Sequence, residues 1–139
     1  MKLYAVIDTN VLVSAMLRWS SVPGNVLEFV FSGTLIPVLN EKIVAEYREV
    51  LMRKKFHLTE DIVEDIISAL EEQGEYINPE SMGYRLPDPK DVVFYAVVMK
   101  KRKDDEAYLV TGNIKHFPVE PFVVTPREML DILLGKDNV

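Results

Sequence analysis

The fold is indicated most directly by residues 88–116, DPKDVVFYAVVMKKRKDDEAYLVTGNIKH. The opening Asp-Pro pair is typical of a helix start, and the apolar run from Val92 to Met99 predicts a helix buried on all sides. Because valine also favours strands, we base this interpretation on the start signal and on the basic residues 100–103, which suit a helix end. Residues 107–111 have the composition of a buried strand. The segment therefore predicts a helix, a polar turn and a strand that stops at small polar residues.

The beginning of the chain shows a similar transition from apolar to polar residues. Residues 3–7, LYAVI, form a continuous apolar run that is typical of a strand covered on both faces. This run leads directly into Asp8, Thr9 and Asn10. Two strands are thus predicted to present polar side chains at the points where they end.

The remaining segments alternate between helix and strand patterns. Such alternation predicts an α/β fold with a largely parallel sheet covered by helices on both faces. Ligands of such sheets gather beyond the carboxyl ends of the strands. Further helices are predicted at residues 10–17, 25–31, 41–53, 59–73 and 127–134, further strands at 35–39, 75–77 and 122–124, and loops at 18–24 and 78–86.

Length and composition predict one intracellular domain over residues 1–139. Of these 139 residues 48% are apolar, which is enough for a single core. No apolar run approaches the roughly 20 residues that a membrane span needs, and the N-terminus has a strand pattern without the features of a signal peptide. Cysteine is absent, which excludes disulfides, thiolate nucleophiles and cysteine-type zinc sites. We therefore expect a cytoplasmic protein without a membrane partner.

The net charge of −6 gives the whole protein a field that repels nucleic acid. A nucleic-acid partner would therefore need local positive charge. Two basic clusters, residues 53–55 and 100–103, or bound cations could supply it. The simpler interpretation of each cluster is a solvated helix end, where positive charge complements the helix dipole.

Three carboxylates are candidates for one metal site. Asp8 ends the first strand, Asp91 begins the helix after residue 88, and Glu46 lies at the margin of the apolar stripe of its helix. Carboxylates that converge in a crevice repel one another, so they either hold protons or surround a hard cation. Oxygen ligands of this kind suit Mg²⁺ or Mn²⁺, and such an ion binds phosphate and activates water.

Each acid also has a purely structural interpretation. Asp8 could cap the following helix, Asp88 is a good N-cap, and Asp91 could be a third-position capping acid. Glu46 could pair with a nearby Arg or Lys. Residues 111–113 could form a simple strand-ending turn. These interpretations are independent of one another, whereas one metal site explains the residues jointly.

Other catalytic arrangements find little support in the sequence. His57 and His116 have no recognisable nucleophile beside them, so we expect surface or capping roles for both. The chain has no glycine-rich dinucleotide loop and no phosphate loop with Gly-Lys-Ser/Thr.

These residues resemble the PIN-domain nucleases, and in particular the group regarded as toxins of toxin–antitoxin modules. The resemblance rests on Asp-Thr-Asn at 8–10, Glu46 in a helix, Asp91 at a helix start with Ala96 inside that helix, and LVTGN at 109–113 followed by His-Phe at 116–117, all in the family's order. It covers nearly the whole chain.

The resemblance implies an α/β/α sandwich with a central five-stranded parallel sheet, and metal-dependent cleavage of RNA. By position, Asp8, Glu46 and Asp91 are implied as metal ligands, and Asn10 and Thr111 as groups that orient them. Asn113 stands where many family members have a fourth acid, so one cation is expected to bind firmly and a second only with the substrate. The resemblance also implies a homodimer and a separate antitoxin protein.

The sequence therefore predicts a ribonuclease in which Asp8, Glu46 and Asp91 hold Mg²⁺ or Mn²⁺, while Asn113 and Thr111 position water or the ligands and Asp88 supports the site. One alternative is a weakly active or inactive protein of the same fold that binds RNA or assembles with other molecules, as the amide at Asn113 suggests. A second is a small phosphatase with Asp8 as its nucleophile. That reaction expects an Asp at position 10, where this chain has Asn10.

Overall fold

Five parallel strands form the central sheet in the order β3-β2-β1-β4-β5. The computed structural model describes residues 2–135, so residues 1 and 136–139 of the predicted domain lie outside the described part. The α/β/α architecture predicted from the sequence is confirmed. The strands are β1 (Leu3–Ile7), β2 (Leu35–Leu39), β3 (Glu75–Tyr76), β4 (Ala107–Val110) and β5 (Val123–Val124).

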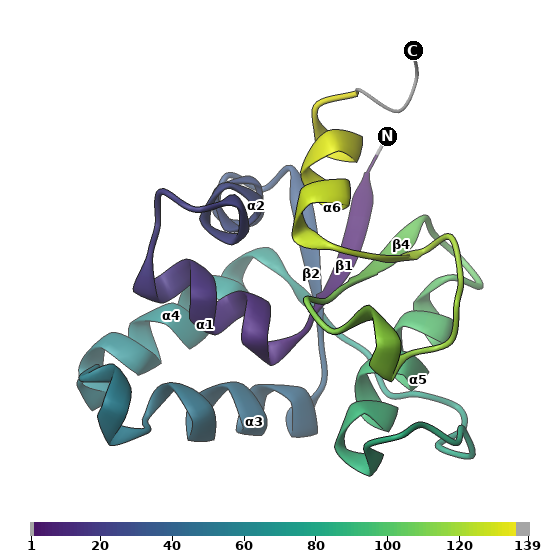
Figure 1. Ribbon diagram of the computed structural model, residues 1–139, viewed down its shortest axis with the longest axis horizontal. Helices are drawn as coiled ribbons and strands as arrows, with labels where there is room; N and C mark the ends of the chain where they lie inside the picture. The colour runs from purple at the N-terminus through teal and green to yellow at the C-terminus, as the bar shows by residue number, and fades with distance from the viewer. Residues whose placement is uncertain (1, 136–139) are drawn as a thin grey trace.

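Helices cover the sheet on both faces (Figure 1). One helix, α5, packs against β1, β2 and β4, and its apolar residues are buried nearly all round, as its sequence predicts. The helices α2 and α4 pack against β2 and against each other, and α6 packs against β5 and α2. The α-helices are α1 (Thr9–Leu17), α2 (Val22–Phe31), α3 (Glu41–Leu51), α4 (Glu60–Gln73), α5 (Val92–Lys101) and α6 (Pro126–Leu133), and the 3-10 helices are η1 (Lys54–Phe56), η2 (Pro89–Asp91) and η3 (Ile114–His116).

The register of the central strands places the polar residues side by side. Ile7 of β1 pairs with Val110 of β4. The residues that follow this pair are Asp8 and Thr111. They therefore lie directly after the carboxyl ends of two adjacent strands. No helix between residues 2 and 135 is both long enough and apolar enough to cross a membrane.

The start of α2 differs from the prediction, which placed residues 18–24 in a loop. The side chain of Ser21 accepts a hydrogen bond from the backbone N–H of Gly24, and Pro23 lies in the first helical turn, where its missing N–H is tolerated. A Cβ at Gly24 would lie only 1.9 Å from the carbonyl oxygen of Trp19. Pro and Gly here belong to a capped helix start that folds back tightly on the preceding turn.

Two further predictions about side-chain placement are wrong. The helical pattern of residues 59–73 predicts a buried stripe of Ile62, Ile66, Ile67 and Leu70, but the side chain of Ile62 is exposed and the adjacent Val63 is buried instead. The basic residues 100–103 do not form a simple solvated helix end, because Lys101 is buried. Its ammonium group pairs with Glu75 and Asp105 and lies 4.1 Å from the centre of the Tyr4 ring.

Candidate active site

A pocket of about 240 Å³ lies where the carboxyl ends of β1 and β4 meet the start of α1, the middle of α3, and the turns η2 and η3. Figure 1 shows these strand ends meeting above α3. The pocket wall contains six of the residues predicted for the site, Asp8, Asn10, Glu46, Asp88, Asp91 and Asn113. Thr111 is fully buried and contacts Asp8.

Asp8 is fixed by the adjacent strand. Its backbone N–H donates to the carbonyl of Val110 at 2.9 Å, and the Thr111 hydroxyl donates to its Oδ2 at 2.7 Å. Asp8 stands at the N-cap position of α1, but its side chain makes no capping hydrogen bond, so helix capping alone does not account for this carboxylate. Burial raises the pKa of Asp8 above its ordinary value, although the Thr111 hydrogen bond opposes this rise. Asp8 is thus a buried carboxylate with a fixed orientation.

Replacing Thr111 with Val is expected to lower the free energy of unfolding by about 1–3 kcal/mol, because Asp8 loses its buried donor and the N–H of Asn113 loses its acceptor. Urea unfolding of the metal-free protein measures this effect. The matched control Thr111→Ser keeps the hydroxyl and should retain most of the stability. Equal losses in both variants would show that the hydroxyl contributes nothing.

Glu46 reaches the pocket from α3 and is tied to α1. Its Oε2 accepts a hydrogen bond from the Thr9 hydroxyl. The neighbouring Tyr47 is buried and donates its hydroxyl to the carbonyl of Ile7, so α3 is held against the last residue of β1. Burial, with the nearby charges of Asp8 and Glu46, raises the pKa of Tyr47 well above its ordinary value. No Lys or Arg among residues 2–135 forms an ion pair with Glu46, which removes its predicted structural alternative.

Asp91 lies at the end of η2, immediately before α5. The capping role belongs to Asp88, whose Oδ1 accepts from the N–H of Lys90 at 3.0 Å. Oδ2 of Asp91 is buried without a hydrogen-bond partner, and Nδ1 of His116 lies 3.4 Å away. Burial, together with the charges of Asp8 and Asp88, raises the pKa of Asp91 to about 6, although His116 opposes the rise. Asp91 therefore carries a buried carboxylate oxygen that has no hydrogen bond within the described residues and faces an imidazole nitrogen.

The two asparagines predicted for the site are placed differently. The backbone N–H of Asn113 donates to the Thr111 hydroxyl at 2.9 Å, and its half-buried side chain lines the pocket. Asn10 is exposed, and no hydrogen bond in the described part of the chain joins it to a carboxylate. The role of Asn10 in orienting a ligand therefore stays a prediction, whereas the adjacent Thr9 donates a hydrogen bond to Glu46.

The donor set of this pocket suits a hard divalent cation. Three carboxylates from distant segments share one pocket, and burial raises the pKa values of both Asp8 and Asp91, with the charges of Asp8 and Asp88 adding to the rise at Asp91. Within residues 2–135, however, no three acidic or imidazole side chains form a ready-made metal site. Glu46 is turned toward Thr9, so binding an ion would require a side-chain adjustment.

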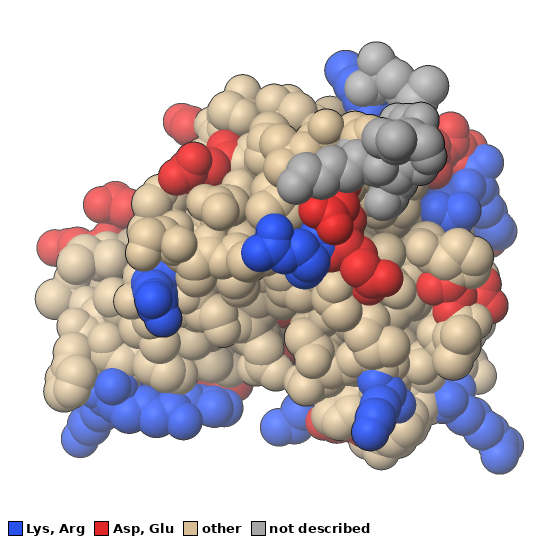
Figure 2. Space-filling view, turned by 45° about the horizontal axis from the view of Figure 1, so that its top comes forward, with Lys and Arg blue, Asp and Glu red and all other residues tan. Residues whose placement is uncertain are grey.

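Two exposed cationic side chains also line the pocket. Arg53, which follows α3, forms only a long surface ion pair of 3.8 Å with Glu49, and such pairs contribute little. Lys90 lies on η2 and makes no ion pair within the described residues. In Figure 2, Lys and Arg side chains gather along the lower rim of the face shown, apart from many of the Asp and Glu residues. Positive charge is thus available beside the acidic pocket of a negatively charged protein.

The sequence did not indicate a role in this pocket for Thr9, Tyr47 or His116. The roles of Thr9 and Tyr47 become visible only in the folded structure. Thr9 connects α3 to the beginning of α1, and Tyr47 connects α3 to the end of β1. His116 was expected to have a surface or capping role, but its side chain lines the pocket beside Asp91. Its spacing of three residues from Asn113, within a predicted turn, was the available signal.

The chain is similar to known proteins. The sequence model of the PIN domain matches residues 4–115 of this chain. The uncharacterized protein MJ1680 of Methanocaldococcus jannaschii is 25% identical in an alignment over 146 residues. The alignment covers 94% of this chain and 91% of the relative. The match to the PIN domain includes every residue assigned to the pocket except His116, which lies one position beyond it.

Proposed function

Because the chain belongs to the PIN-domain family, whose members are generally nucleases, we propose that it is a Mg²⁺- or Mn²⁺-dependent ribonuclease that hydrolyses RNA phosphodiester bonds. One observation carries this proposal. Asp8, Glu46 and Asp91 are separated widely in the sequence, and the fold brings them to one pocket at the carboxyl ends of the central strands. A buried oxygen of Asp91 has no hydrogen-bond partner there.

The residues of the chain have distinct tasks in this proposal. Thr111 fixes the carboxylate of Asp8, and Thr9 holds Glu46 where it can turn into the pocket. When bound, the cation supplies the positive charge that neutralises the phosphate and increases the acidity of water. Asp8, Glu46 and Asp91 would hold one ion firmly. Asn113 brings no charge, so a second ion would depend on the oxygens of the substrate.

Arg53 and Lys90 are proposed to bind the phosphates that flank the cleaved bond. The Arg53→Gln variant should bind single-stranded RNA more weakly, and the slope of log affinity against log salt should become shallower by about 0.7. Fluorescence anisotropy at several salt concentrations, with the Asp8→Asn background to prevent cleavage, measures both effects.

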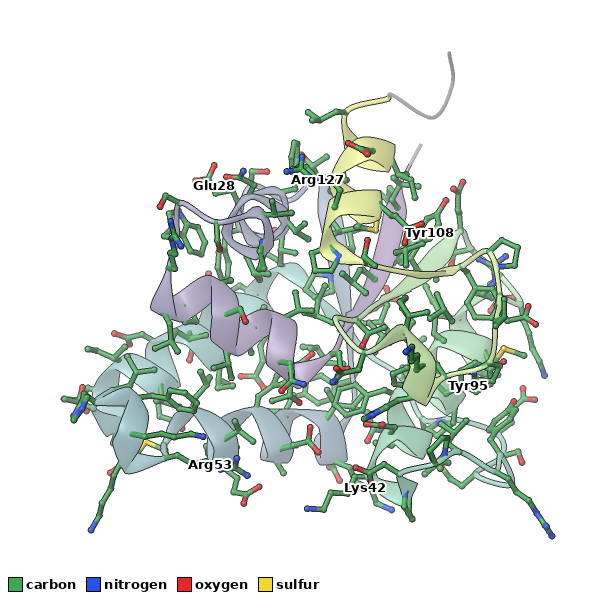
Figure 3. The ribbon with its side chains drawn as sticks, viewed as in Figure 1. Glu28, Lys42, Arg53, Tyr95, Tyr108 and Arg127 are labelled. Carbon is green, nitrogen blue, oxygen red and sulfur yellow. The ribbon has the colours of Figure 1, made fainter. Side chains whose placement is uncertain are left out.

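The matched control is Arg127→Gln. Arg127 is exposed on α6 at the opposite side of the molecule from Arg53, which lies beside α3 (Figure 3). Its removal takes away the same net charge without touching the pocket. Equal effects of the two variants would mean that Arg53 acts only through the overall charge.

Incubation of the purified chain with a mixed-sequence RNA tests the proposed reaction. Cleavage is expected with Mn²⁺ or Mg²⁺, and it should disappear with excess EDTA and return when the cation is restored. Cleavage that persists in EDTA would contradict the proposal. The RNA products should carry new ends at internal positions, as an endonuclease produces them.

We also propose that the chain acts in the cytoplasm as the toxin of a toxin–antitoxin pair and forms a homodimer. This part of the proposal rests on the likeness of its motifs to that group. Induced expression in a bacterial host should arrest growth, and Asp8→Asn should relieve the arrest at equal protein levels. Unimpaired growth with the active enzyme would contradict the toxin role but leave the ribonuclease activity standing.

A second candidate function is RNA binding or assembly without turnover. It is favoured by the amide at Asn113 and by the absence, within residues 2–135, of a metal site that is formed without side-chain movement. Tight RNA binding in Mn²⁺ without any product would support this function. Cleavage that depends on Asp8 would exclude it.

A further inference from the structure

His116 lies in the pocket without a role in the function proposed above. Its Nδ1 faces the buried Oδ2 of Asp91 at 3.4 Å, and that oxygen has no hydrogen-bond partner. The His116 side chain lines the pocket and is 47% exposed, so its ring is accessible from solvent. The two facing atoms, an anionic oxygen and an imidazole nitrogen, are both able to bind a metal ion.

The local backbone places His116 above Asn113. The two residues are joined through η3, a single 3-10 turn, and the N–H of His116 donates to the carbonyl of Asn113 at 2.9 Å. The next residue, Phe117, is buried and anchors the turn. The chain therefore holds an imidazole in the immediate neighbourhood of its uncharged Asn113.

The contact between Asp91 and His116 is longer than a strong ion pair requires. A charged imidazole and a carboxylate form hydrogen bonds of about 2.7–2.9 Å, which is shorter than the 3.4 Å observed here. Adjacent donor atoms around an octahedral ion with bonds of about 2.1 Å are separated by roughly 3 Å. The observed 3.4 Å is about 0.4 Å longer than this separation, so a small side-chain movement would bring both atoms onto one ion.

We propose that Nδ1 of His116 is a direct ligand of the cation that Asp91 binds, and that the site therefore prefers Mn²⁺ or another first-row transition ion to Mg²⁺. This inference rests on the metal site of the proposed function. Imidazole suits transition metals, whereas Mg²⁺ is bound almost entirely through oxygen. With three carboxylates and no fourth acid at Asn113, the imidazole adds a strong ligand without adding charge.

Pulsed electron paramagnetic resonance of the Mn²⁺-loaded full chain tests the proposal directly, without reference to activity. The sequence contains only two histidines, so a nitrogen coupling of the imidazole type has few possible sources. We expect this coupling in the wild type, its loss in His116→Gln, and its retention in His57→Asn. Asn is the suitable control at position 57 because the backbone there has a φ of +57°, which Asn tolerates.

Isothermal titration of Mn²⁺ and of Mg²⁺ into the same three proteins gives the second measurement. The His116→Gln variant should lose Mn²⁺ affinity by roughly tenfold or more, whereas its Mg²⁺ affinity should change less. Mn²⁺ binding of equal strength in wild type and His116→Gln, without a nitrogen coupling, would overturn the role of His116 and leave the carboxylate site standing. Absence of Mn²⁺ binding in all three proteins would overturn both the inference and the metal-dependent function.

Discussion

Replacing Asp8 with Asn is expected to lower the rate of metal-dependent RNA cleavage about a thousandfold, which corresponds to about 4 kcal/mol of lost transition-state stabilisation. The substitution removes one of the three negative charges that are proposed to hold the cation. Asn has nearly the same shape, and its side-chain oxygen can accept the hydrogen bond that Thr111 now donates to Asp8. The fold should therefore remain intact while the chemistry is lost.

Single-turnover cleavage of a labelled RNA in Mn²⁺ measures this effect, and thermal unfolding of the same samples verifies the fold. Asp65→Asn is a matched control, since Asp65 is an exposed acid on α4, outside the pocket. Its cleavage rate should equal that of the wild type. An Asp8→Asn variant that cleaves at the wild-type rate would remove Asp8 from the mechanism.

Replacing Asp91 with Asn is expected to stabilise the metal-free protein at neutral pH. Burial and the charges of Asp8 and Asp88 raise the pKa of Asp91 from 3.8 to about 6, so its ionised form is unfavourable in the folded state. The rise corresponds to about 3 kcal/mol, which solvent screening in an open pocket reduces to about 1–2 kcal/mol. The variant should thus melt several degrees above the wild type.

The pH dependence of this difference has a defined sign. A raised folded-state pKa contributes stability that is fully present below the unfolded value of 3.8 and is lost as pH rises through about 6. The wild type and Asp91→Asn should therefore have similar stability near pH 4. Their melting temperatures should separate between pH 4 and pH 6 and remain apart at pH 7.5.

Thermal unfolding in EDTA and in excess Mn²⁺ completes this test. Mn²⁺ should raise the melting temperature of the wild type by mass action and leave that of Asp91→Asn nearly unchanged. A variant that is less stable than the wild type in EDTA would show that Asp91 is a structural residue. The closeness of the acids in the pocket would then not lower the free energy of unfolding.

The sequence allowed the main architecture to be predicted because its central strands are continuous apolar runs that end abruptly in polar residues. Residues 3–7 and 107–111 are examples, and their polar ends also led to Asp8 and Thr111, which the register of β1 and β4 places side by side. Glu46 was suggested by its position at the margin of a buried stripe. These inferences depend on local periodicity, which a single sequence displays.

The errors concern features that depend on tertiary contacts. The start of α2 was missed because Pro23 and Gly24 usually mark loops, whereas here the glycine allows close contact with the backbone of Trp19. The burial of Lys101 within four consecutive basic residues depends on which side of α5 faces the sheet. Its spacing of four from the buried Val97 was an available signal.

The contact between His116 and Asp91 was not predicted from the sequence, because it depends on how η3 is placed relative to η2. Asp91 and His116 come from different turns, and only the packed fold brings them within 3.4 Å. In the same way, the sequence did not show that the side chain of Thr9, and not that of Asn10, contacts Glu46. Neighbouring polar residues after a strand point in different directions, and the helix start determines which one reaches α3.

The two outermost strands of the sheet, β3 and β5, are only two residues long. They expose few unpaired backbone groups, and short edges of this kind discourage aggregation through strand pairing between molecules. Two copies of this chain would therefore have little opportunity to join their sheets, and a dimer would have to form through helices. Exposed apolar side chains on the helices include Leu17 at the end of α1 and Ile62 on α4. Self-association of this protein should accordingly be sensitive to substitutions on its helices and insensitive to those along its sheet edges.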